Sequence, residues 1–94
     1  MELNNMPYGA TQTETPIFLV YIDRLVPRHG VDPEKIQKYL LLPEDAHPIS
    51  LSGRVVMDGH HRVAVASARG QKTIRAVAFE YEGKLYEIDP AVIA

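Results

Sequence analysis

Apolar and polar positions along the chain indicate several short strands and two helices. Strands are expected at five places, residues 17–22, 49–51, 54–57, 73–81 and 84–88. The run at residues 17–22 is uninterrupted, β-branched and aromatic, which is typical of a strand buried on both faces. Glu82 and Gly83 separate the last two strands and suit a two-residue hairpin turn. Residues 25–30 are expected to form a connecting loop.

Signals at the helix ends predict where the two helices lie. Asp32 is a favoured N-cap, and Pro33 fits the first helical position of a helix that Pro43 stops. A second helix is expected over residues 60–69, with Gly70 as the left-handed residue that follows it. Together these elements predict an α+β fold, in which a small mixed sheet is combined with two main helices.

Length and composition indicate one ordinary domain. The chain has 94 residues, which is too few for two domains that each bury a core. Residues 1–15 are polar and aperiodic, so we expect a flexible N-terminal segment followed by one domain over residues 16–94. The longest uncharged apolar run, residues 16–22, is too short to cross a bilayer, and no signal-peptide pattern precedes it. We therefore expect a cytoplasmic protein that does not enter a membrane.

Charge and cysteine content exclude several classes of function. The chain has no cysteine, which rules out disulfides, zinc-thiolate sites and thiol nucleophiles. Its formal net charge is −2, whereas proteins that coat nucleic acid without sequence preference normally carry a basic excess. A local basic pocket around Arg54, His60, His61 and Arg62 is compatible with this balance.

The candidate chemistry lies in one segment, Asp58-Gly59-His60-His61-Arg62, where a predicted strand turns directly into a predicted helix. The first amide groups of a helix have no intrahelical partner, and the helix dipole places partial positive charge there. Glycine lets a ligand approach the backbone, and the two histidines and the arginine add donors at the same end. The segment is therefore predicted to bind an anion, most simply a phosphate.

Several roles remain open for individual side chains. Asp58 suits capping the helix, holding one of the histidines, or ligating magnesium beside a nucleotide. One of the two histidines suits a general base or a phosphate donor, since imidazole titrates near neutrality. Their adjacent positions do not have the spacing of zinc ligands, so no metal site is expected. In a catalytic version, His60, His61 and Arg62 are the candidate catalytic residues, with the arginine and one histidine stabilising developing charge.

A family pattern becomes visible at these residues. Residues 55–64, 68–70 and 73–74 resemble the ParB/sulfiredoxin-like superfamily, whose members often show a strand, Asp-Gly-x-His-Arg, an alanine-rich helix, a glycine and a further strand. The order of residues 22–27, a short helix and Pro48-Ile49 also follows this group. The resemblance covers about residues 17–81.

The resemblance implies a nucleotide-phosphate pocket at the start of the second helix. By position, Gly59, His60, His61 and Arg62 would contact phosphates and Asp58 would shape the loop. Activities in the superfamily include CTP binding by chromosome-partition proteins, ATP-dependent reduction of sulfinic acids, and ADP- or ATP-dependent phosphorylation of free serine. The implied cofactor is thus ATP, ADP or CTP, with magnesium as a companion. Many members are described as ParB-like nucleases.

Two departures from the superfamily narrow the prediction. Sulfiredoxin needs a cysteine that this chain does not have. The serine kinases use a glutamate base in the loop after the first strand, where this chain has Arg28 and His29. We therefore predict a ParB-like nucleotide-binding domain, extending to a minimal phosphotransferase or nucleotide hydrolase. The alternatives are a ParB-like nuclease or DNA-associated protein and a non-catalytic interaction module, and exposed strand edges are compatible with a homodimer.

Overall fold

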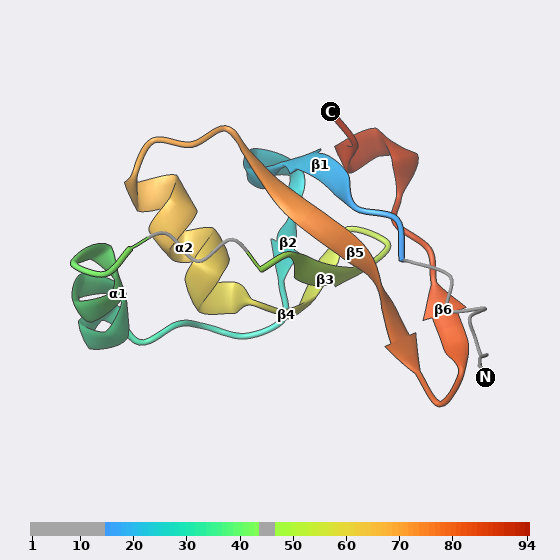
Figure 1. Cartoon of the computed structure of the whole chain (residues 1–94), viewed down its shortest axis with the longest axis horizontal. Helices are drawn as coiled ribbons and strands as arrows, with labels where there is room; N and C mark the ends of the chain where they lie inside the picture. Colours follow the sequence, from blue (N-terminus) through green and yellow to red (C-terminus); the bar gives the residue numbers. More distant parts are fainter. Residues whose placement is uncertain (1–14, 44–46) are drawn as a thin grey trace, which may run out of the picture.

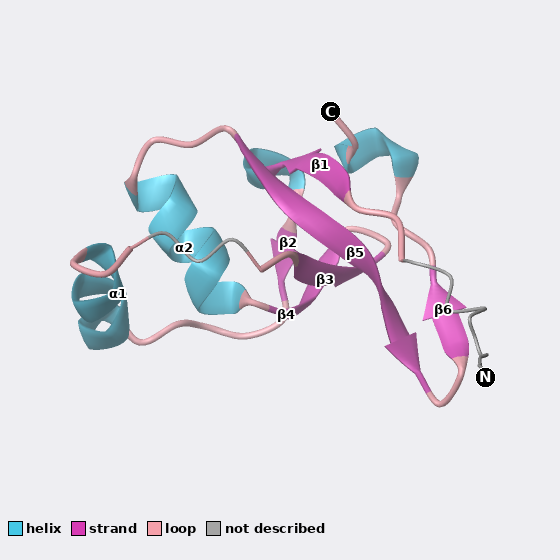
Figure 2. Ribbon diagram, in the orientation of Figure 1, coloured by secondary structure: helices cyan, strands magenta, loops and turns pink. Residues whose placement is uncertain are grey.

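A mixed sheet of six strands lies beside two helices (Figures 1 and 2) in the computed structural model, which describes residues 15–43 and 47–94. The strands are β1 (Phe18–Tyr21), β2 (Val26–Pro27), β3 (Ile49–Ser52), β4 (Val55–Asp58), β5 (Thr73–Tyr81) and β6 (Lys84–Tyr86). The helices are α1 (Pro33–Leu40) and α2 (His60–Ala68), with 3-10 turns η1 (Ile22–Arg24) and η2 (Pro90–Val92). The predicted α+β fold, a small mixed sheet with two main helices, is confirmed. The segment expected to be flexible lies outside the described residues, apart from Thr15.

The strand order places β5 and β3 at the centre of the sheet. It runs β1-β5-β3-β4-β2, and β6 pairs with the far end of β5. β3 runs parallel to β5 and β2 runs parallel to β4, while the other pairs are antiparallel. Figure 1 shows α1 and α2 together at one end of the molecule, with the β5–β6 hairpin projecting at the other.

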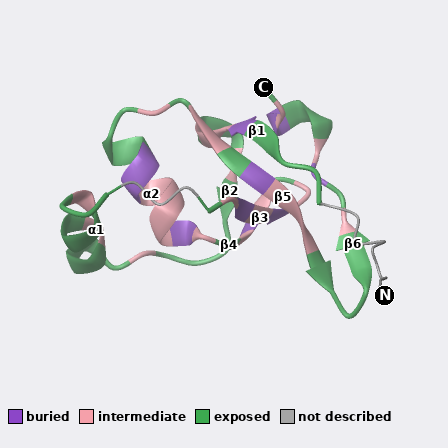
Figure 3. Ribbon diagram, in the orientation of Figure 1, coloured by how far each residue is buried: buried purple, intermediate pink, exposed green. Residues whose placement is uncertain are grey.

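The core lies where β1, β3, β4 and β5 meet the C-terminal segment, as the purple regions of Figure 3 show. Its buried members are Val20, Ile49, Leu51, Val56, Ala76, Ile88 and Val92. The register between β3 and β5 explains why the core residues of these strands share one face of the sheet. Ile49 lies opposite Ala76, and Leu51 lies opposite Ala78. Val63 of α2 packs against this cluster, so the helix closes the core on the side where β4 ends.

The apolar run at residues 17–22 forms a shorter strand than expected, and the prediction that it is buried on both faces is wrong. Val20 is fully buried, but Phe18 is at the border of exposure and Leu19 is 53% exposed. β1 lies at the edge of the sheet. Leu19 lies opposite Arg75, which is also exposed, so this face of the strand carries no second layer. Sequence periodicity cannot distinguish a two-sided strand from an edge strand with an apolar outer face.

The residues predicted to cap α1, to form the last hairpin turn and to follow α2 have these roles in the structure. The carboxylate of Asp32 accepts a hydrogen bond from the backbone N–H of Glu34 at 2.9 Å and caps α1. Glu82 and Gly83 both have positive φ, 51° and 80°, as a type I′ hairpin turn requires. Gly70 follows α2 in the left-handed conformation, with φ of 83°.

The sequence analysis missed the short strand β2. Within the residues expected to form a loop, Val26 and Pro27 pair in parallel with Val55 and Val56, so a two-residue strand was missed. Both residues are exposed, and the strand is defined by its pairing with β4, which the local pattern could not show. The two α-helices have eight and nine residues, and no helix in the described part of the chain has the length and apolar character needed to span a membrane.

The core assignment is tested by comparing a buried leucine with an exposed one. Leu51→Ala is expected to lower the free energy of unfolding by about 2–5 kcal/mol, because it leaves a cavity among fully buried neighbours. Leu85→Ala removes the same atoms from a side chain that is 55% exposed, and a change within about 0.5 kcal/mol is expected. Urea denaturation of both variants measures the difference, and equal losses would contradict the assignment.

Candidate functional site

The turn between β4 and α2 is built on a left-handed glycine. β4 ends at Asp58, α2 begins at His60, and Gly59 between them has φ of 100° and ψ of 25°. A Cβ at this position would lie 2.6 Å from Cγ2 of Ile49 and 3.1 Å from a terminal guanidinium nitrogen of Arg62. Packing and backbone conformation therefore both require glycine here, independently of any ligand.

All five residues of the predicted segment line one cavity. It has a volume of about 450 Å³ and lies between α1, α2 and the start of β5. Its wall beyond Asp58, Gly59, His60, His61 and Arg62 is formed by Tyr39, Leu42, Pro43, Val65, Ala66, Arg69, Gln71 and Ile74. The cavity thus has a polar end at the start of α2 and an apolar wall farther along the helix.

The start of α2 lines this cavity with residues that precede the first hydrogen bond of the helix. The first hydrogen bond of the helix is donated by the N–H of Val63 to the carbonyl of Gly59, so the amides of the preceding three residues lie before it. Among the described residues, no side chain caps this helix, and its first turn contains no acidic residue. The positive end of the helix dipole is consequently not neutralised within the helix itself.

The two histidines are hydrogen-bonded to the loop before α1. His60 is buried, with 7% of its surface exposed, and its Nε2 accepts a hydrogen bond from the N–H of Arg28 at 3.0 Å. Nε2 of His61 accepts from the N–H of Asp32 at 3.2 Å. An imidazole nitrogen accepts only when it is unprotonated, so both rings are neutral in this arrangement.

His60 also lies in an environment that disfavours its charged form. Its ring stacks on that of His29, with 3.7 Å between the ring centroids. Burial first, and then the neighbouring His29, Arg28 and His61, lower the pKa of His60 below its ordinary value of 6.5, while Asp58 opposes them. His60 is therefore a neutral acceptor at physiological pH.

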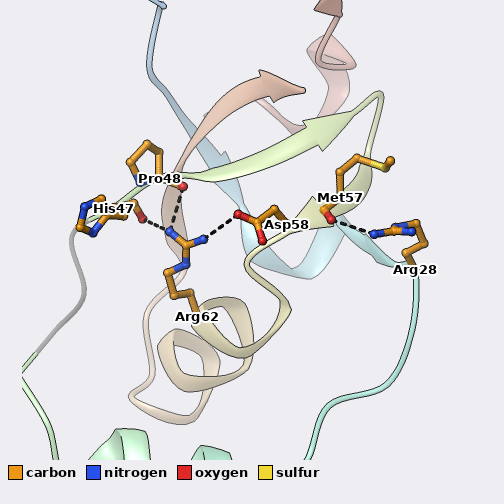
Figure 4. Close-up of polar contacts among 6 residues, drawn as sticks. All are labelled: Arg28, His47, Pro48, Met57, Asp58 and Arg62. Atoms are coloured by element: carbon orange, nitrogen blue, oxygen red, sulfur yellow. Dashed lines mark hydrogen bonds and ion pairs between the residues drawn. The ribbon is translucent and has the colours of Figure 1, made fainter. Parts of the chain in front are cut away.

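Arg62 connects the backbone just before β3 to the carboxylate at the end of β4 (Figure 4). One terminal nitrogen donates to the carbonyls of His47 and Pro48, both at 3.0 Å, and the other contacts the Asp58 carboxylate at 3.2 Å. The side chain thus fixes the entry to β3 against the first turn of α2. Arg62 therefore has a structural role in addition to the phosphate-binding and catalytic roles that the sequence predicts for it.

The sequence analysis did not single out two arginines that hold segments around the site together. Arg69 lines the cavity and donates to the carbonyls of Leu42 at 2.8 Å and Tyr39 at 3.4 Å. Its position seven residues after Arg62 places both on one face of the helix, and this spacing was the available signal. Arg28 donates to the carbonyl of Met57 at 3.0 Å (Figure 4), a contact between distant segments that no local pattern indicates.

Arg54 does not belong to the predicted basic pocket. It precedes the start of β4, whereas the candidate site follows the end of that strand, and it does not line the cavity. Its guanidinium instead contacts the carboxylate of Asp89 at 3.4 Å. The expectation that Arg54 joins His60, His61 and Arg62 is therefore wrong, because β4 separates them along its length.

Comparison with known proteins adds no relative. The chain matches no family model, no curated protein and no solved structure. The ParB/sulfiredoxin-like resemblance stays a prediction that rests on the residues quoted for it.

A pair of glycine variants tests how tightly the turn is packed. Gly59→Ala is expected to lower the free energy of unfolding by about 2–5 kcal/mol, as the sum of left-handed strain of about 1–2 kcal/mol and overpacking against Ile49 of about 1–3 kcal/mol. Gly53→Ala has positive φ but nothing within 4 Å of its Cβ, so only the strain of about 1–2 kcal/mol is expected. Chemical denaturation gives both values. A Gly59 variant no weaker than the Gly53 variant would show that the turn relaxes freely.

Proposed function

We propose that the chain binds a nucleotide, with its phosphates at the start of α2 inside the 450 Å³ cavity. The observation that carries this proposal is the uncapped, glycine-preceded end of α2, which opens onto a cavity lined by two arginines. Backbone amides and the helix dipole favour an anion at such an end without any specialised side chain.

The charges around the cavity also favour an anion. Arg62 and Arg69 line it, and Asp58 is the one carboxylate in the lining that the described residues provide. The Asp58 carboxylate is 77% exposed and offsets part of the charge of Arg62. The favourable field at the start of α2 comes chiefly from the helix amides, and Arg69 adds positive charge to the same cavity at the opposite end of the helix.

The size and lining of the cavity favour a nucleotide over a free phosphate ion. Cavities of a few hundred Å³ with an apolar wall and a few polar groups are typical of small organic ligands. Leu42, Val65 and Ile74 supply the apolar wall, and Tyr39 offers an aromatic ring at the rim. A phosphate at the polar end leaves this wall available to a nucleoside. The resemblance to ParB-like proteins supports the same ligand class.

The residues around the cavity do not supply a magnesium site of their own. No group of three or more histidine, cysteine, aspartate or glutamate side chains gathers anywhere in residues 15–43 and 47–94. Asp58 is already paired with Arg62, and a single carboxylate provides too few ligands to hold a cation. Magnesium would therefore enter with the phosphates of the ligand, and we assign no step to it.

Binding is better supported than catalysis. Nε2 of His60 and Nε2 of His61 face backbone amides of the chain itself, so neither atom is directed at a proton on a bound acceptor. The catalytic role of His60, His61 and Arg62 stays a prediction from the sequence.

Thermal unfolding with ligands tests the proposal. ATP, ADP, CTP, GTP, inorganic phosphate and a short DNA duplex are each added with and without magnesium. A nucleotide at about one hundred times its dissociation constant should stabilise the fold by about 2.7 kcal/mol. A shift with DNA alone would favour the nucleic-acid alternative, and no shift with any ligand would favour an interaction module; either result contradicts the proposal.

Two variants locate the binding site. His61→Glu keeps an acceptor for the N–H of Asp32 but adds negative charge to the first helical turn. It is expected to preserve stability without ligand and to weaken nucleotide binding about tenfold or more through like-charge repulsion. Arg54→Ala is the control, since it removes a positive charge outside the cavity and breaks only an exposed ion pair. Binding lost equally in both variants would place the ligand elsewhere.

A further inference from the structure

Two histidines fasten the segment between β2 and α1 to the start of α2. His60 accepts from the N–H of Arg28 and His61 accepts from the N–H of Asp32, at the two ends of one five-residue loop. Residues 28–32 are exposed except for Val31, which is half-buried. The position of this loop therefore depends on hydrogen bonds to two imidazole rings, on the stacking of His29 against His60 and on the bond from the Arg28 side chain to Met57, with little burial.

Helix α1, which follows this loop, is held by polar contacts and by two half-buried apolar residues, Ile36 and Leu40. None of its residues is buried, and Figure 3 shows it at the margin of the molecule. Arg69 donates to the carbonyl of Tyr39 in the last turn of the helix and to that of Leu42 just beyond it. The ring of Tyr39 meets that of His61 edge-on, with 6.1 Å between the centroids. Since Tyr39 and Leu42 also line the 450 Å³ cavity, any displacement of α1 changes the cavity wall.

Protonation of His60 would convert this attachment into a repulsion. A proton on Nε2 places a donor against the N–H donor of Arg28 and removes the acceptor. The charged ring would also lie on His29, with Arg28 and His61 nearby, and the Asp58 carboxylate alone offsets these neighbours. The protonated ring is thus disfavoured for as long as the loop stays in place.

We propose that His60 and His61 form a pH-sensitive latch that holds α1 over the cavity, and that protonation of His60 releases the β2–α1 loop. The latch is closed while the His60 ring is neutral. It goes beyond nucleotide binding and does not require it, because the hydrogen bonds exist within the chain alone.

The direction of the pH dependence follows from linkage. In the closed state the pKa of His60 is lowered, whereas in the open state the ring is free to return toward its ordinary value of 6.5. Above pH 6.5 both states hold the ring neutral, and pH has no effect through this group. As pH falls below 6.5 the open state takes up the proton first, so opening becomes more favourable until the closed state is protonated too.

Amide hydrogen exchange followed by NMR, together with the titration of the His60 ring, tests the latch without ligand. The protection factor of the Arg28 amide is expected to fall about tenfold as His60 titrates, which corresponds to the loss of one hydrogen bond. Amides in the ladder between β3 and β5 serve as the internal reference and should keep their protection, because the opening is local.

Matched variants separate the latch from general acid unfolding. His60→Gln supplies an oxygen acceptor that does not titrate, and it should hold the Arg28 amide equally well at low and neutral pH. His60→Phe keeps a ring against His29 but has no acceptor, so the amide should be unprotected at every pH. His47→Gln, at an exposed position outside the latch, should respond to pH as the native chain does.

The proposal is overturned if protection of the Arg28 amide does not change while the His60 ring titrates, or if His60→Gln shows the same fall as the native chain. Neither result depends on ligand. Failure of the latch is therefore distinguishable from failure of nucleotide binding, which the thermal unfolding experiment measures on its own.

Discussion

The close contact between Gly59 and Ile49 is the constraint on which the rest of the site depends. Ile49 is fully buried in the centre of the core, and the backbone of Gly59 rests directly on it in a conformation that favours glycine. This contact fixes where β4 stops and in which direction α2 leaves the sheet. The amides of the first helical turn, the two histidines and Arg62 all take their positions from that direction.

The arginines at the two ends of α2 stabilise neighbouring segments of the chain as well as lining the cavity. Arg62 fixes the entry to β3, Arg69 fixes the end of α1, and both line the same cavity. The guanidinium group suits this double use, because its five donors can satisfy protein carbonyls and still present positive charge nearby. Removing either arginine would therefore disturb the walls of the cavity as well as its charge.

The two halves of the molecule are stabilised by different forces. The sheet and the C-terminal segment are held by buried apolar side chains such as Val20, Leu51 and Val92. Helix α1 has no buried residue and is attached by hydrogen bonds from Arg69 and to His61. Hydrogen bonds of this kind contribute little net free energy each, so a change of protonation can alter the attachment of α1 while the core stays intact.

The sequence by itself determined the elements whose signals are local. Asp32 as a cap, the Glu82-Gly83 turn and the glycine that separates β4 from α2 were predicted correctly, because each depends on a few neighbouring residues. The tertiary structure alone decided that β1 lies at an edge, that residues 26–27 pair with β4, and that Arg54 lies away from the site. It also decided that the imidazoles accept from the β2–α1 loop. Such outcomes depend on contacts between residues far apart in the chain, and local patterns carry no information about which distant donor will meet which acceptor.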